Sequence, residues 1–162
     1  MKRATASFMK ESPLHWVALG GGAGLSPWAP GTVGSLLGFP LFLLLRALPW
    51  GVQWSLLAGL FLFGIWACGA TARALEDEDP KAVVWDEVVA CAGVLLLAPP
   101  TGLGWMLGFG LFRLFDIWKP FPIGWVDRRI KGGVGIMLDD ALAAVLAMWI
   151  LWHIKGVWHG HF

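Results

Sequence analysis

The sequence predicts an all-α protein, a polytopic membrane helical bundle, and three observations lead to this prediction. Hydrophobic residues make up 57% of the 162 residues and charged residues only 14%, with a mean hydropathy of +0.68, which leaves too little polar surface for a soluble domain. The apolar residues fall into five runs separated by polar or turn-forming segments. The chain has 12 Trp and no Tyr, and most of these tryptophans lie near the ends of the runs, where the indole N–H favours a membrane boundary.

We expect one integral membrane domain over residues 1–162, with an interfacial segment at 1–19 and a polar tail at 155–162. The formal net charge of +1, and a sequence without basic runs interleaved with aromatic residues, argue against nucleic-acid binding. Membrane lipids are the expected surroundings, and the sequence leaves the oligomeric state open.

The first two apolar runs predict a helical hairpin. Residues 32–48 form a run interrupted only by Arg46, residues 52–75 form a second run, and the Pro-Trp-Gly sequence at 49–51 predicts a turn between them. An acidic segment with a helix-stopping proline, Pro80, follows the second run.

The middle two runs, 86–98 and 103–115, are shorter and are separated by the Pro-Pro-Thr-Gly sequence at 99–102. A helix of this length rises about 20 Å, less than the roughly 30 Å of bilayer hydrocarbon. We therefore expect these helices either to be re-entrant or to cross where the bilayer is thinned. The break favours a hairpin over one continuous span, which would put Asp86 and Asp116 in opposite compartments. The last run, 138–154, follows a loop rich in glycine and basic residues.

If each short turn reverses the chain, the N-terminus and residues 24–32, 75–87 and 116–140 lie on one face. All 11 acidic residues and ten of the 12 basic residues then lie on that face, the exceptions being Arg46 and Lys155. The excess of Lys and Arg predicts that this face is cytoplasmic. The same reversals bring acidic segments that are distant in sequence close together.

Five carboxylates at the ends of the apolar runs are the candidate catalytic and metal-binding residues: Asp86, Glu87, Asp116, Asp139 and Asp140. Hard divalent ions such as Mg²⁺ prefer oxygen ligands, so these acids predict a Mg²⁺ site. The alternative is that acids at helix starts only favour the helix dipole. That explanation fails for Asp116, which is expected at a helix C-terminus, where a negative charge is unfavourable.

Two cations and two hydroxyl groups are candidate phosphate ligands. Arg113 shares a helix face with Asp116, and Pro120 is expected to turn Lys119 out of the helix toward the same place. The glycine-rich segment at 20–35 runs into a helix that Thr32 is expected to cap, and Ser35 lies at the end of this segment. The alternatives are that the cations are topology signals and that the loop is a tight turn.

Four segments together resemble the bacterial phosphatidylglycerophosphatase A family. They read APGTVGS at 29–35, DEVV at 86–89, FRLFDIWKPFPI at 112–123 and GIMLDD at 135–140. The resemblance extends over about residues 20–147. It implies a Mg²⁺-dependent, multi-pass phosphatase of the bacterial inner membrane that converts phosphatidylglycerophosphate to phosphatidylglycerol and inorganic phosphate at the cytoplasmic face.

Two other functions remain open from the sequence. One is a small membrane transporter with a carboxylate-lined cation path, which would favour acids near the middle of the bilayer rather than at one surface. The other is a structural membrane subunit. For the phosphatase, the sequence leaves open direct attack by water and a covalent phospho-aspartate.

Overall fold

The computed structural model describes residues 2–159 and the side chains of residues 2–154, so the side chains of the expected polar tail at 155–162 lie outside the described part. Within the described residues the fold is all-helical, as predicted. In chain order the elements are α1 (Ala6–Lys10), α2 (Pro13–Ala18), the 3-10 helix η1 (Gly20–Leu25), α3 (Pro30–Arg46), α4 (Trp50–Leu75), α5 (Trp85–Leu97), α6 (Gly102–Trp118), α7 (Ile123–Arg129) and α8 (Gly132–His159).

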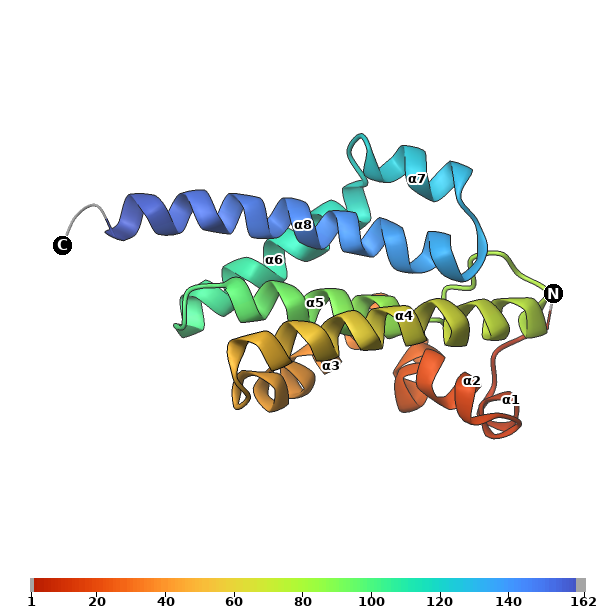
Figure 1. Cartoon of the computed structure of the whole chain (residues 1–162). Helices are drawn as coiled ribbons and strands as arrows, with labels where there is room; N and C mark the ends of the chain where they lie inside the picture. Colours follow the sequence, from red (N-terminus) through yellow and green to blue (C-terminus); the bar gives the residue numbers. More distant parts are fainter. Residues whose placement is uncertain (1, 160–162) are drawn as a thin grey trace.

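The turns between α3 and α4 and between α5 and α6 lie at one end of the bundle, together with the C-terminal end of α8 (Figure 1). The N-terminal helices, the end of α4 and the start of α8 lie at the other end, which we call the polar end (Figure 1). Both predicted hairpins are therefore present. The second one returns the chain so that Asp86 and Asp116 lie at the same end.

The helix bounds differ from the predicted runs by up to six residues, and the differences in α3, α6 and α8 affect the candidate site. The expected cap Thr32 is not a cap, because α3 begins at Pro30 after Ala29, whose φ of 43° is left-handed and whose side chain makes no capping bond. Helix α6 continues to Trp118. Helix α8 begins at Gly132, so Asp139 lies about two turns inside it, too far from its start for the helix dipole to explain the acid.

Small residues let α3 pack closely on the acidic end of α5. A Cβ atom added at Gly34 would lie 2.6 Å from the Cβ of Val84, and one at Gly38 would lie 2.8 Å from the Cβ of Cys91. Only glycine permits this approach without displacing the neighbouring helix. The contact fixes the first turns of α3 beside the first turn of α5.

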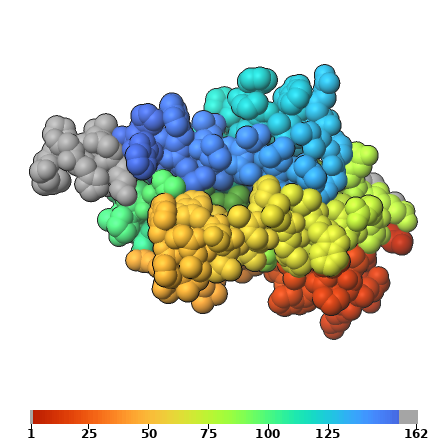
Figure 2. All heavy atoms as spheres, viewed as in Figure 1, coloured from red at the N-terminus to blue at the C-terminus, as the bar shows by residue number. Residues whose placement is uncertain are grey.

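Helices α4 and α8 cross at similarly short range near the polar end. A Cβ atom added at Gly133 would lie 1.9 Å from the carbonyl oxygen of Ile65 and 2.9 Å from the Cα of Gly69. Close contact with α4 explains why the Gly-Gly sequence at 132–133 is helical. Away from it a hollow separates the two helices, with atoms of α5 at its floor (Figure 2).

Two helices of the described chain are long and apolar enough to cross a membrane, Trp50–Leu75 and Gly132–Ile154. Large apolar side chains on the outer surface include Leu44, Leu62 and Met106, each about two thirds or more exposed. Exposed apolar surface of this kind suits a lipid environment. Helices α3, α5 and α6 are shorter, with 17, 13 and 17 residues.

Replacing Gly38 by alanine tests the close packing of α3 on α5. The new methyl group would overlap Cys91, and we expect a loss of stability of about 1–3 kcal/mol. The matched control is Gly59→Ala in α4, where nothing lies within 4 Å of the added Cβ. Thermal unfolding in detergent measures both variants, and equal midpoints for the two would contradict this account of the interface.

Candidate active site

The structure brings all five predicted carboxylates together at the polar end. Asp86 and Glu87 lie in the first turn of α5, Asp116 lies in the last turn of α6, and the Asp139–Asp140 pair lies in α8. Oxygen atoms of two triads approach within 4.8 Å of one another, and Asp140 belongs to both. The triads are Asp86, Asp139 and Asp140, and Glu87, Asp116 and Asp140.

These acids are largely buried, and only some of their oxygens have hydrogen-bond partners. Asp86 is 8% exposed and Asp140 is 3% exposed. Four carboxylate oxygens are buried without a hydrogen-bond partner among the described atoms: Asp86 Oδ1, Glu87 Oε2, Asp139 Oδ1 and Asp140 Oδ2. Burying a charged oxygen without a partner costs several kcal/mol, and either protonation of the acid or a nearby cation would remove this cost.

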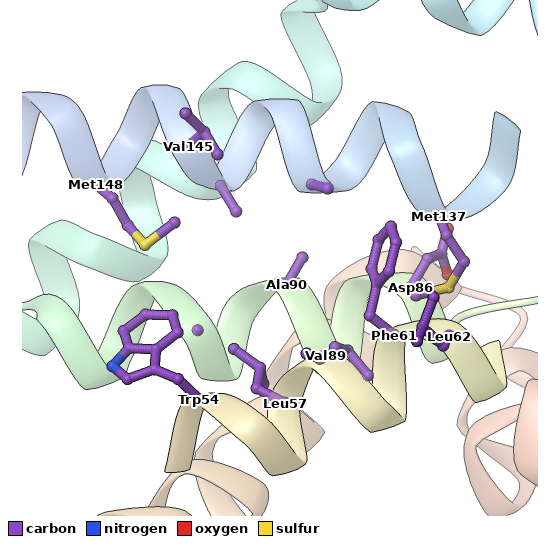
Figure 3. A pocket seen from close by; sticks show the side chains of 14 residues that line it. Trp54, Leu57, Phe61, Leu62, Asp86, Val89, Ala90, Met137, Val145 and Met148 are labelled. Carbon is purple, nitrogen blue, oxygen red and sulfur yellow. The ribbon is translucent and has the colours of Figure 1, made fainter. Parts of the chain in front are cut away.

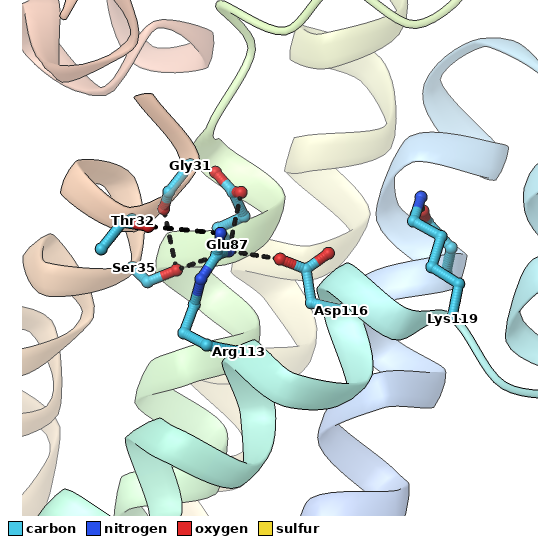
Figure 4. Close-up of polar contacts among 8 residues, drawn as sticks. Gly31, Thr32, Ser35, Glu87, Arg113, Asp116 and Lys119 are labelled. Carbon is cyan, nitrogen blue, oxygen red and sulfur yellow. Dashed lines mark hydrogen bonds and ion pairs between the residues drawn. The ribbon is translucent and has the colours of Figure 1, made fainter. Parts of the chain in front are cut away.

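Arg113 connects α3, α5 and α6 at this site (Figure 4). Its Nη1 donates to Glu87 Oε1 at 3.1 Å and also to Asp116. The same nitrogen donates to Ser35 Oγ at 3.2 Å, and Nη2 donates to Thr32 Oγ1 at 3.4 Å. Three of the four residues predicted to bind phosphate, Arg113, Thr32 and Ser35, therefore form one network.

Glycine at position 31 leaves room for the Glu87 carboxylate against the first turn of α3. A Cβ atom added at Gly31 would lie 2.0 Å from Glu87 Oε1. The Gly31 carbonyl accepts a hydrogen bond from Ser35 Oγ at 2.9 Å, which orients that hydroxyl. The positive end of α3 thus has a carboxylate beside it, a favourable placement for a negative charge.

Lys119 leaves α6 as predicted, but it contacts acids of two other helices. Its φ of 46° is left-handed and ends the helix. The ammonium group donates to Asp139 Oδ2 at 2.6 Å and to Asp127 Oδ1 at 2.9 Å. Burial lowers the pKa of Lys119, but the bonds and charges of Asp139 and Asp127 outweigh this effect and raise its pKa above the ordinary value.

Asp127 is the member of the cluster that sequence reasoning missed. It lies in α7, a helix of seven residues that no apolar run indicated, and its neighbours Arg128 and Arg129 made the segment look like a basic loop. With Asp127 included, six acids face two cations among the side chains of residues 2–154. The acids are Asp86, Glu87, Asp116, Asp127, Asp139 and Asp140, and the cations are Arg113 and Lys119.

The excess of acid suits a divalent cation, and the guanidinium beside it suits an anion. Both lie at one end of an apolar helical bundle with long membrane-type helices. The fold and the site together define a class of helical bundle with membrane-type helices and a site for a cation and an anion at one end.

Comparison with known proteins agrees with this class. Residues 16–155 match the family model described as Phosphatidylglycerophosphatase A. A Phosphatidylglycerophosphatase A of Escherichia coli is 40% identical over 157 residues, covering 96% of this chain and 91% of the relative. One from Haemophilus influenzae is 42% identical over 147 residues, covering 89% and 90%.

A Bacteroides thetaiotaomicron protein, provisionally named a phosphatidylinositol-3-phosphatase, is 40% identical over 154 residues and covers 83% of this chain and 93% of the relative. No solved structure matches. The chain belongs to the phosphatidylglycerophosphatase A family.

Replacing Arg113 by lysine tests the guanidinium network. An ammonium cannot reproduce bonds from two nitrogens to α3, α5 and α6 at once, so we expect a loss of stability of about 1.5–3 kcal/mol. The control is Arg128→Lys, an exposed position of α7, with an expected change within about 0.5 kcal/mol. Denaturation followed by circular dichroism, without divalent ions, gives both values, and equal stabilities would remove Arg113 from its connecting role.

Proposed function

We propose that this chain is a Mg²⁺-dependent phosphatase that hydrolyses phosphatidylglycerophosphate to phosphatidylglycerol and inorganic phosphate. The family membership and the names of the Escherichia coli and Haemophilus influenzae relatives support the activity. The observation that carries the proposal is a set of buried carboxylate oxygens without partners, next to the Arg113 guanidinium.

The residues of the site fit a hard divalent ion. All the candidate ligand atoms are carboxylate oxygens, and each triad lies within 4.8 Å, close enough to share one ion. We assign Asp86, Glu87, Asp116, Asp139 and Asp140 as its ligands. When bound, Mg²⁺ would polarise the phosphate ester and lower the pKa of a coordinated water.

The protein's own groups would then bind the anion and manage protons. Arg113, with the hydroxyls of Thr32 and Ser35 in its network, would donate to the phosphoryl oxygens as negative charge develops. A carboxylate of the cluster would accept a proton from the attacking water. The new P–O bond forms in line with the ester bond that breaks, and the departing glycerol oxygen takes up a proton.

Lys119 has a second role in this proposal. Its bonds to Asp139 and Asp127 would hold the Asp139 carboxylate in place, and its positive charge would attract the phosphate to the polar end. The ammonium stays charged at physiological pH because its pKa is raised.

For the location we propose a multi-pass protein of the bacterial inner membrane, with its polar end in the cytoplasm. The long apolar helices α4 and α8 support insertion in a membrane. Lys and Arg gather in the segments of the polar end, which supports the orientation by the positive-inside rule. A phosphatase site placed there would meet lipid headgroups at the inner leaflet.

A cation transporter is the weaker candidate. A transport path would need polar groups along the bundle, whereas the large cleft between α4 and α8 is lined by apolar side chains apart from Asp86 at one end. The acids cluster at the polar end instead.

Removing divalent ions tests the metal. Phosphate release from phosphatidylglycerophosphate by detergent-solubilised protein should stop in excess EDTA and return with added Mg²⁺, because the acids would otherwise repel one another and the substrate. Detergent micelles carry no gradient, so turnover there also separates a phosphatase from a transporter. Undiminished release in the chelator would contradict the proposed Mg²⁺ dependence.

Single amide substitutions test the ligands. Asp140→Asn and Asp116→Asn should each lower kcat by roughly a hundredfold or more, because each removes a charged ligand or proton acceptor. Glu11→Gln, at an exposed position after α1, is the matched control and should retain activity. Malachite-green detection of phosphate measures all three, and near-normal turnover of both aspartate variants would remove these residues from the chemistry.

A further inference from the structure

A long cleft begins at the carboxylate cluster and runs between α4 and α8 over α5. Its volume is about 430 Å³, within the range of specific ligand pockets, about 300–1,000 Å³. In Figure 3, Asp86 and Met137 lie at one end of it and Trp54 and Met148 at the other. Asp86 therefore belongs both to the candidate active site and to this cleft.

The lining of the cleft is apolar, and Asp86 is the one charged side chain among its described lining residues. Small residues leave the space open, with Ala90 and Gly93 of α5 and Ala144 of α8 among the lining residues. A polar headgroup would be poorly solvated along such walls, whereas a hydrocarbon chain would not.

The cleft opens on the apolar outside of the bundle. Leu62 on α4 and Val145 on α8 both line it, and they are 66% and 57% exposed. An opening with such a rim on helices of membrane length faces lipid rather than water. A lipid could therefore enter sideways from the bilayer.

The length of the cleft corresponds to one leaflet. From Met137 to Met148 the α8 wall rises about 17 Å. One leaflet of hydrocarbon is about 15 Å thick, half of a roughly 30 Å core. A single extended acyl chain whose headgroup lies at the Asp86 end would end near Trp54.

We propose that this cleft binds one acyl chain of the lipid substrate, with the phosphate end at Asp86 and the methyl end near Trp54 and Met148. The inference rests on the proposed phosphatase function. An acyl chain that moves from the bilayer into the cleft exchanges one apolar environment for another, so it gains little hydrophobic free energy. The cleft therefore contributes to catalysis by aligning the substrate. The cleft orients the substrate so that its phosphate reaches the buried acids.

Narrowing the cleft tests the inference. Ala58→Trp and Val145→Trp fill it from the α4 and α8 walls at exposed positions, where folding tolerates the added ring. With dihexadecanoyl phosphatidylglycerophosphate in mixed micelles we expect kcat/KM to fall about tenfold, and with the dihexanoyl lipid to stay within about twofold. Leu43→Trp, at an exposed position of α3 that does not line the cleft, should leave both substrates unaffected. An equal effect on both chain lengths, or none on either, overturns the proposal.

Photo-crosslinking of the unaltered protein gives an independent readout. Phosphatidylglycerophosphate with a diazirine at the methyl end of one chain, each chain labelled in turn, should crosslink to peptides containing Trp54 or Met148. Crosslinks confined to outer-surface residues such as Leu44 and Met106 overturn the cleft assignment even where phosphate is released. If the unaltered protein releases no phosphate, the proposed function fails, and the cleft is then judged by the crosslinks alone.

Discussion

The burial of acidic side chains at one end of the bundle is the constraint on which the rest of the structure depends. Four helices deliver carboxylates to this end, and among the described side chains Arg113 and Lys119 are the cations that form ion pairs with them. Such crowding is unfavourable unless positive charge is supplied. Arg113 and Lys119 reduce the repulsion locally, because each forms ion pairs with acids from two helices. The remaining partnerless oxygens leave a deficit that a divalent ion would fill.

Backbone features close to the carboxylates help to accommodate their burial. The glycines of α3 admit the Glu87 carboxylate and bring α5 near, and the left-handed conformation of Lys119 turns its ammonium toward Asp139. A residue other than glycine in that conformation costs roughly 1–2 kcal/mol. The conformational cost at Lys119 is offset by its charged hydrogen bonds to Asp127 and Asp139, which a lysine continuing the helix would not make.

Much of this arrangement could be predicted from the sequence, because strong local signals encode it. Proline and glycine at 49–51 and 99–102 mark the reversals, and those reversals alone suffice to bring Asp86 and Asp116 to one end. The start of α8 could not be predicted, since Gly132 and Gly133 suggest a loop by propensity. Contact with α4 overrides that propensity. Asp127 was missed for a related reason, because its helix is too short to show a period and its partner Lys119 is chosen by tertiary packing.

The crossing of α4 and α8 has a mechanical consequence. Their backbones touch at Gly69 and Gly133, close to the acids, and the helices are free of such contact toward Trp54. The two helices are therefore in close contact near the polar end and are separated by the cleft farther along, and α8 carries both Gly133 and the Asp139–Asp140 pair. In a bilayer, a change in thickness that tilted one helix against the other would move mainly their ends away from this contact. Such a tilt would then change the width of the cleft more than the spacing of the acids at the polar end.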